Sequence, residues 1–186
     1  MIINIHGFTG SGDNTKYRWL KANVPHHEIH SPTFDYAAMS PESILRQLAD
    51  KVSAYMEAQP PGAAALHALG SSLGGFFARC LNLLFPQLTT VLINPSLVPF
   101  LTLRGYIDCK AYLALLARLA YRDDTLAGEQ SRLRVIIGDS DELINHELLT
   151  KPLLPPDFRQ LYIIRGGRHQ LELTPEVGGI LKSILE

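Results

Sequence analysis

Short apolar runs alternate with longer helical patterns along the chain, and this alternation constrains the fold more than any other feature. Most of the runs are nearly continuous in apolar residues and bounded by Gly, Pro or Asn, which is typical of strands buried on both faces of a parallel sheet. The predicted strands are Ile2–Ile5, His27–His30, Ala63–Ala68, Thr90–Asn94, Leu133–Ile137 and Gln160–Ile164. The predicted helices are Pro41–Glu57, Gly75–Leu84, Tyr106–Tyr121 and Pro175–Leu185. The pattern predicts an α/β fold, doubly wound around a mostly parallel sheet of about six strands.

The stretch from Ser96 to Gln130 is longer than one crossover helix requires. We expect a helical excursion over the strand ends there, in which residues 96–130 act as a lid or a pocket wall. The chain has 186 residues, enough to bury a sizeable core. It contains no repeat, low-complexity tract or linker, so we expect residues 1–186 to form a single domain.

Composition and charge narrow the classes of partner. Hydrophobic residues make up 46% of the chain and charged residues 19%, and the formal net charge is −1. This balance provides no basic surface for a nucleic acid or an anionic membrane. It favours a small-molecule partner and leaves the oligomeric state open.

Three features of the sequence bear on its location. No apolar stretch is long enough to predict stable membrane insertion. The opening residues "MIINI" lack the basic start of a signal peptide. Cys80 and Cys109 match no metal-binding spacing and are expected to be free thiols, which favours a cytoplasmic protein.

The strongest chemical signal is the segment "LGSSLGG", which lies between a strand-like run and a predicted helix. It contains Gly-x-Ser-x-Gly, the pattern of a nucleophile elbow, in which a strained turn exposes the serine hydroxyl. Small residues two positions away on each side let the strand and the helix approach closely. Ser72 is therefore the candidate nucleophile, because the equivalent neighbours of Ser71 would be Leu69 and Leu73. A glycine-rich turn without chemistry is the alternative interpretation.

A serine hydroxyl needs a base, and the base needs a group that orients it. On folds with this elbow the order along the chain is serine, acid, histidine. His169 lies in a glycine loop after the last predicted strand, whereas His146 has no strand leading into it, so His169 is the candidate base. The segment "GDSDELI" offers Asp139, Asp141 and Glu142 after another strand. Asp141 is favoured because Asp139 is expected to cap the turn, but Asp139 stays an open alternative.

The glycine loop "HGFTGSG" after the first strand has two common uses, binding a phosphate or stabilising an oxyanion. A phosphate loop needs Gly-Lys-Ser/Thr, but Gly12 is followed by Asp13, whose carboxylate would repel a phosphate. The glycines do not fit the dinucleotide pattern Gly-x-Gly-x-x-Gly either. An oxyanion loop is the better interpretation. The two donors would be the backbone N–H groups of Phe8 and of Leu73, which starts the helix after the elbow.

The segments "IHGF", "GSSLGG", "INPSLVP", "GDSDELI" and "GGRH" follow one another along nearly the whole chain. With these segments the sequence resembles the α/β-hydrolase superfamily and, more narrowly, the small YqiA-like bacterial esterases. The resemblance implies Ser72 as nucleophile, Asp141 as acid and His169 as base, with Phe8 and Leu73 forming the oxyanion hole. It also implies a trimmed α/β-hydrolase sheet without the antiparallel strand pair of larger members, and "INPSLVP" as a pocket wall.

The expected function is a serine hydrolase that cleaves carboxylic esters of small or acyl-chain substrates through an acyl-enzyme, with no metal or other cofactor. The candidate substrate-binding residues are Phe8, Leu97 and Phe100, whereas Phe76 and Phe77 are expected to belong to the core. An acyl-thioesterase with the same residues is the nearest alternative. A non-catalytic binding module is the alternative from another class, and a lyase on the same scaffold is a third.

Overall fold

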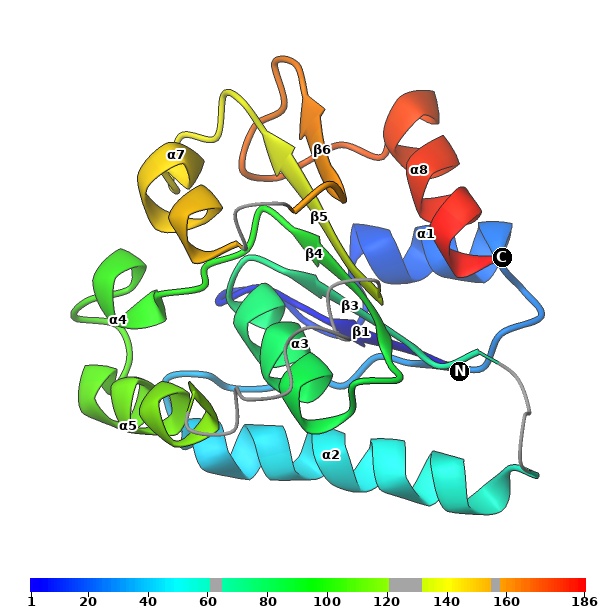
Figure 1. Ribbon diagram of the computed structural model, residues 1–186, viewed down its shortest axis with the longest axis horizontal. Coiled ribbons are helices and arrows are strands. Elements are labelled where there is room, and N and C mark those ends of the chain that lie inside the picture. The colour runs from blue at the N-terminus through cyan, green and yellow to red at the C-terminus, as the bar shows by residue number, and fades with distance from the viewer. Residues whose placement is uncertain (61–64, 121–131, 155–157) are drawn as a thin grey trace.

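The computed structural model of the protein describes residues 1–60, 65–120, 132–154 and 158–186. In these residues six strands form one sheet in the order β2-β1-β3-β4-β5-β6, and every neighbouring pair is parallel (Figure 1). The strands are β1 (Ile2–Ile5), β2 (Ile29–His30), β3 (His67–Ser71), β4 (Thr89–Ile93), β5 (Leu133–Gly138) and β6 (Leu161–Ile164). The predicted α/β fold with a mostly parallel sheet of about six strands is confirmed.

Helices cover both faces of this sheet (Figure 1). One face carries α2 (Pro41–Ala58) and α3 (Leu73–Leu84), with α5 (Cys109–Ala120) against them, and the other carries α1 (Thr15–Asn23) and α8 (Pro175–Leu185). The short helices α4 (Pro99–Thr102) and α7 (His146–Leu149), and a 3-10 turn at Lys151–Leu153, follow the carboxyl ends of β4 and β5. None of the helices in the described ranges is both long and apolar enough to cross a membrane.

Each face of the sheet buries its own apolar layer. Ile3 and Ile5 of β1 belong to the layer under α2 and α3, whereas Ile2 belongs to the layer under α1 and α8, as the alternation of side chains along a strand requires. Phe76 and Phe77 of α3 lie inside the first layer, as the sequence predicts, and their rings contact the ring of Tyr112 in α5. Close packing on both faces holds the strand ends in fixed positions.

Four predicted elements begin later than the sequence pattern indicates: β2 begins at Ile29 instead of residue 27, β6 at Leu161 instead of residue 160, and β3 and α5 shift further. The predicted strand 63–68 is wrong in position, because β3 begins at His67, where it pairs with Ile2 of β1, and it runs on to Ser71. Residues 63 and 64 lie outside the described part. α5 begins at Cys109 rather than at residue 106, since the side chain of Asp108 accepts two N–H groups of the first helical turn, each at 3.1 Å. Residue 121, the last of that predicted helix, lies outside the described part.

The sequence pattern does not predict α1. Leu20 is the single fully buried side chain among its nine residues, so the apolar periodicity that marks an amphipathic helix is weak. A cap starts this helix, because the side chain of Asn14 accepts the N–H of Tyr17 at 3.0 Å.

The expected excursion over residues 96–130 is described only in part. α4 lies beyond the carboxyl end of the sheet, as a pocket wall would, but α5 packs against α2 and α3 instead of covering the strand ends (Figure 1). Of the described part of this stretch, the segment between β4 and α5 is therefore the one that lies beside the strand ends, and its role as a pocket wall stays a prediction. Residues 121–130, the last part of the predicted excursion, lie outside the described ranges.

Candidate active site

Three of the predicted site residues meet at the carboxyl edge of the sheet. Ser72 directly follows β3, Asp141 follows β5, and His169 follows β6. The hydroxyl Oγ of Ser72 lies 3.0 Å from Nε2 of His169. The other ring nitrogen of His169, Nδ1, lies 3.0 Å and 2.9 Å from the two carboxylate oxygens of Asp141. The three side chains thus form one continuous line of hydrogen bonds.

Ser72 occupies a strained turn between β3 and α3. Its φ of 53° and ψ of −122° lie in a region that side-chain-bearing residues rarely adopt. The turn needs small neighbours, because a Cβ on Gly70 would lie 2.2 Å from the carbonyl oxygen of Gly74, and a Cβ on Gly74 would lie 2.1 Å from that of Ile5. These contacts explain the Gly-x-Ser-x-Gly spacing and place the Ser72 hydroxyl at the N-terminus of α3.

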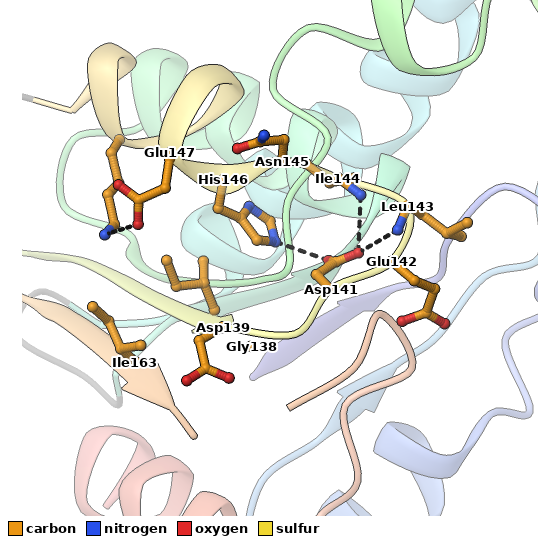
Figure 2. Close-up of a pocket in the computed structure, with 12 residues that line it drawn as sticks. Gly138, Asp139, Asp141, Glu142, Leu143, Ile144, Asn145, His146, Glu147 and Ile163 are labelled. Atoms are coloured by element: carbon orange, nitrogen blue, oxygen red, sulfur yellow. Dashed lines mark hydrogen bonds and ion pairs between the residues drawn. The ribbon is translucent and has the colours of Figure 1, made fainter. Parts of the chain in front are cut away.

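Asp141 is a buried carboxylate with many donors. Its side chain is 1% exposed. The Oδ1 atom accepts the backbone N–H groups of Leu143 and Ile144, each at 2.9 Å (Figure 2). Burial alone would raise the pKa of this carboxyl, but the hydrogen bonds from His169 and from these two N–H groups outweigh it and lower the pKa below its usual value. The group is therefore held as an anion beside the imidazole.

The two other acids of "GDSDELI" bind the backbone of the loop between β6 and α8 instead, the histidine loop, which carries His169. Asp139 accepts the N–H of Gly166 at 2.6 Å, and Glu142 accepts the backbone N–H of His169 at 3.0 Å. The bond to His169 lowers the pKa of Glu142. Of the three candidate acids, only Asp141 contacts the imidazole ring in the described structure.

Asn94, which directly follows β4, forms hydrogen bonds with the same loop. The sequence pattern does not predict this role of Asn94. Its Nδ2 donates to the carbonyl oxygens of Arg168 at 2.8 Å and His169 at 2.9 Å, and its Oδ1 accepts the N–H of Gly138 at 2.7 Å. Its φ is 42°, a conformation that asparagine tolerates better than most residues. An asparagine directly after an apolar strand, as in "LINPS", is the signal that could have identified it.

The predicted oxyanion donors lie beside the elbow. Gly7 packs on Ser72 so closely that a Cβ there would lie 3.2 Å from Cβ of the serine. Phe8 is the next residue, and no acceptor among the described residues takes its N–H or that of Leu73. Both groups are free to donate to a bound molecule.

His6 holds this loop in place. Its Nε2 accepts the N–H of Phe34 at 2.9 Å, so the proton lies on Nδ1, which donates to the carbonyl of Gly7 at 2.7 Å. The Tyr36 hydroxyl donates to the carbonyl of His6 at 2.7 Å. Burial lowers the pKa of His6, which keeps the ring neutral and this tautomer in place.

The three candidate substrate-binding residues differ in accessibility. Phe8 is half-buried, and its ring meets the edge of the exposed Tyr106 ring with centroids 6.0 Å apart. Phe100 is also half-buried. Leu97 is only 8% exposed and packs in the core layer of α2 and α3. Phe8 and Phe100 therefore offer more surface to a ligand than Leu97 does.

A second histidine also reaches Asp141. Nε2 of His146, in α7, lies 2.8 Å from Oδ2 of Asp141 (Figure 2). Both residues border a cavity of about 410 Å³. No group of three or more His, Cys, Asp or Glu side chains in the described residues could hold a metal ion.

Comparisons with known proteins place this architecture in a family. Residues 1–152 match the model described as "Uncharacterised protein family (UPF0227)". The chain belongs to this family. UPF0227 proteins of Shewanella sp. strain ANA-3 and of Shewanella oneidensis are each 27% identical to it over 186 residues, which cover 99% of this chain and 97% of each relative.

Solved structures share the fold at low sequence identity. Est1E from Butyrivibrio proteoclasticus, with bound ferulic acid, gives a TM-score of 0.68 at 16% identity, covering 99% of this chain and 87% of that one. A putative α/β-superfamily hydrolase from Xanthomonas campestris gives 0.62 at 17%, covering 99% and 95%. The Paleococcus ferrophilus monoacylglycerol lipase gives 0.61 at 12%, covering 98% and 90%. The expected trimmed α/β-hydrolase fold is confirmed.

Proposed function

We propose that this protein is a serine hydrolase that cleaves carboxylic esters of small or acyl-chain substrates through an acyl-enzyme intermediate. The observation that carries the proposal is the 3.0 Å contact between Ser72 Oγ and His169 Nε2, with Asp141 on the opposite nitrogen of the ring. A weak nucleophile, its base and the group that orients the base are thereby aligned. The structural relatives include a lipase and a putative hydrolase, which is consistent with this chemistry.

The reaction has two halves. His169 takes the proton of Ser72 as Oγ attacks the ester carbonyl, and then gives it to the leaving alkoxide, which departs as the alcohol. Water, deprotonated by the same imidazole, next attacks the acyl-enzyme and releases the carboxylic acid and the free serine. Asp141 keeps the proton of the neutral ring on Nδ1 and stabilises the imidazolium that forms in each half.

The developing oxyanion needs donors that are already oriented. The N–H groups of Phe8 and Leu73 fit this role, because both lie beside Ser72 and neither has an acceptor in the described residues. The N-terminus of the twelve-residue helix α3 adds a favourable dipole at the same point. Phe8 and Phe100 are the proposed contacts for the apolar part of the substrate.

The test compares the two adjacent serines. We expect Ser72→Ala to lower kcat for short p-nitrophenyl esters by about 10³-fold or more and to abolish labelling by a fluorophosphonate probe. Ser71→Ala is the matched control, because the Ser71 hydroxyl is buried and has no hydrogen-bond partner in the described residues. It should keep both the activity and the labelling.

The same experiment separates the alternatives. A non-catalytic binding module would leave the wild-type protein unlabelled and inactive. A lyase would consume its substrate without accumulating an acyl-enzyme. An acyl-thioesterase would be labelled at Ser72 and would prefer thioesters over esters of the same chain length in a substrate panel. Ser72→Ala with wild-type hydrolysis would overturn the proposal.

A further inference from the structure

The carboxylate of Asp141 is shared between two histidines. Oδ2 lies 2.9 Å from Nδ1 of His169 and 2.8 Å from Nε2 of His146. The side chain of His146 is 5% exposed, and that of Asp141 is 1% exposed. Figure 2 shows the His146 ring directed at the carboxylate from α7, while Leu143 and Ile144 approach the other oxygen. Two imidazoles therefore donate to one anion.

The hydrogen bonds of His146 fix its tautomer. An anionic carboxylate only accepts, so Nε2 of His146 carries a proton and donates it. Nδ1 lies 2.8 Å from the hydroxyl of Thr150, which is fully buried. In a neutral ring Nδ1 is an acceptor, so the Thr150 hydroxyl donates to it. Thr150, His146 and Asp141 thus form a directional chain that ends on the carboxylate.

The surroundings of His146 favour the neutral ring on balance, because burial outweighs the attraction of Asp141 for the charged ring. Burial lowers its pKa, Asp141 raises it, and His169 and Lys151 lower it again. Asp139, Glu142 and Glu147 complete the charged lining of the 410 Å³ cavity beside the ring. The neutral ring leaves the negative charge of Asp141 available to His169.

His146 binds Oδ2, the carboxylate oxygen of Asp141 that the backbone N–H groups do not reach. The two N–H groups of the turn both bind Oδ1, and His169 Nδ1 is almost equidistant from the two oxygens, at 3.0 Å and 2.9 Å. Without His146, Oδ2 would have His169 as its single donor in the described residues. The carboxylate would then be held mainly through Oδ1, and its orientation against the imidazole of His169 would be less firmly fixed.

We propose that His146 is a positioning residue for the triad acid, donating its Nε2–H to Oδ2 of Asp141 and so fixing the orientation of the carboxylate against His169. The inference rests on the serine-hydrolase function proposed above. His146 does not contact Ser72 in the described structure, so it acts through Asp141 and not on the substrate.

Two substitutions separate the hydrogen bond from the packing. His146→Leu places an apolar side chain of similar bulk beside Asp141 and removes the N–H donor. His146→Gln places an amide N–H near the position of Nε2 and cannot become cationic. Glu147→Gln is the matched control, because Glu147 is the next residue of α7, is exposed, and pairs with Lys151 away from the carboxylate.

We expect His146→Leu to lower kcat by roughly 10- to 100-fold with little change in KM, the effect of losing one charge-assisted hydrogen bond to a carboxylate. The acid limb of its kcat/KM profile should move to higher pH. The reason is that Asp141, with one donor fewer, holds the imidazolium of His169 more tightly. His146→Gln should recover most of kcat and the wild-type acid limb, and Glu147→Gln should match the wild type.

A spectroscopic measurement tests the inference without turnover. The low-field proton NMR signal of the His169 Nδ1–H should move in His146→Leu and return toward its wild-type position in His146→Gln. Wild-type kinetics and an unmoved signal in His146→Leu would overturn the inference, as would equal impairment of the Leu and Gln variants with an unchanged acid limb. An inactive, unlabelled wild type would instead reject the proposed function, and the NMR signal would still decide the role of His146.

Discussion

The two ends of the sheet bury histidines in different surroundings. At the carboxyl end, both ring nitrogens of His6, His146 and His169 have hydrogen-bond partners. At the amino end, His67 opens β3 with 3% of its surface exposed, and neither of its ring nitrogens has a partner in the described residues. The ring of His27 meets it edge-on, with the two ring centroids 5.4 Å apart.

The difference shows that burial alone does not prepare a histidine for proton transfer. Burial, with repulsion from His27 and the amino group of Met1, lowers the pKa of His67 to about 4. Burial also lowers the pKa of His146, but there Asp141 opposes the shift. Among the described residues, a buried anion lies only at the carboxyl end, because the loops after β5 and β6 converge there. Changes at the carboxyl end should therefore affect turnover, and changes at the amino end should affect stability against acid.

The largest expected effect follows removal of the anion at the carboxyl end. Asp141→Asn should lower kcat by about 10⁴-fold with the fold intact. The backbone N–H groups that bind Oδ1 would hold the amide oxygen, so the amide NH₂ would face Nδ1 of His169. That nitrogen would then accept, its proton would move to Nε2, and the ring could no longer take the proton of Ser72. Ester hydrolysis measures the loss of kcat, and circular dichroism checks that the fold is intact.

Asp139→Asn is the matched control for this substitution. An asparagine at position 139 still has an oxygen for the N–H of Gly166, so kcat should stay within about twofold of wild type. A large loss with Asp139→Asn and none with Asp141→Asn would exchange the roles of the two acids.

Much of this arrangement could be predicted from the sequence, because parallel strands bring their carboxyl ends to one edge. That rule, together with the strict spacing of the elbow, identified Ser72, Asp141 and His169 as candidates. The same rule does not identify Asn94 and His146, for physical reasons. Asn94 acts through two bonds to the loop of His169 and one to the end of β5, and His146 reaches Asp141 from a one-turn helix without a strand before it. Such contacts depend on loop paths, and a single sequence does not encode loop paths as a local pattern.

The second prediction concerns Asn94, which ties the histidine loop to the sheet. Asn94→Ala loses three hydrogen bonds and keeps a positive φ that alanine disfavours. We expect a loss of about 3 kcal/mol in the free energy of unfolding, or roughly 6–12 °C in Tm, and a fall of about tenfold in kcat. Asn94→Gly removes the same bonds without the backbone strain and should recover about 1 kcal/mol. Unchanged Tm and kcat in both variants would show that the loop is held without Asn94.

The smallest expected effect belongs to the amino end and appears only in acid. Between about pH 6.5 and pH 4 the unfolded chain protonates His67 while the folded protein does not, so this residue lowers stability as the pH falls. The loss amounts to about 2 kcal/mol at pH 5. His67→Leu should remove it, so that the free energy of unfolding in urea falls less from pH 8 to pH 5 than in the wild type. Its kcat at pH 8 should be unchanged, because residue 67 lies at the opposite end of β3 from Ser72. If this variant keeps the wild-type pH dependence of stability, or loses activity at pH 8, the two ends of the sheet do not differ in the way described.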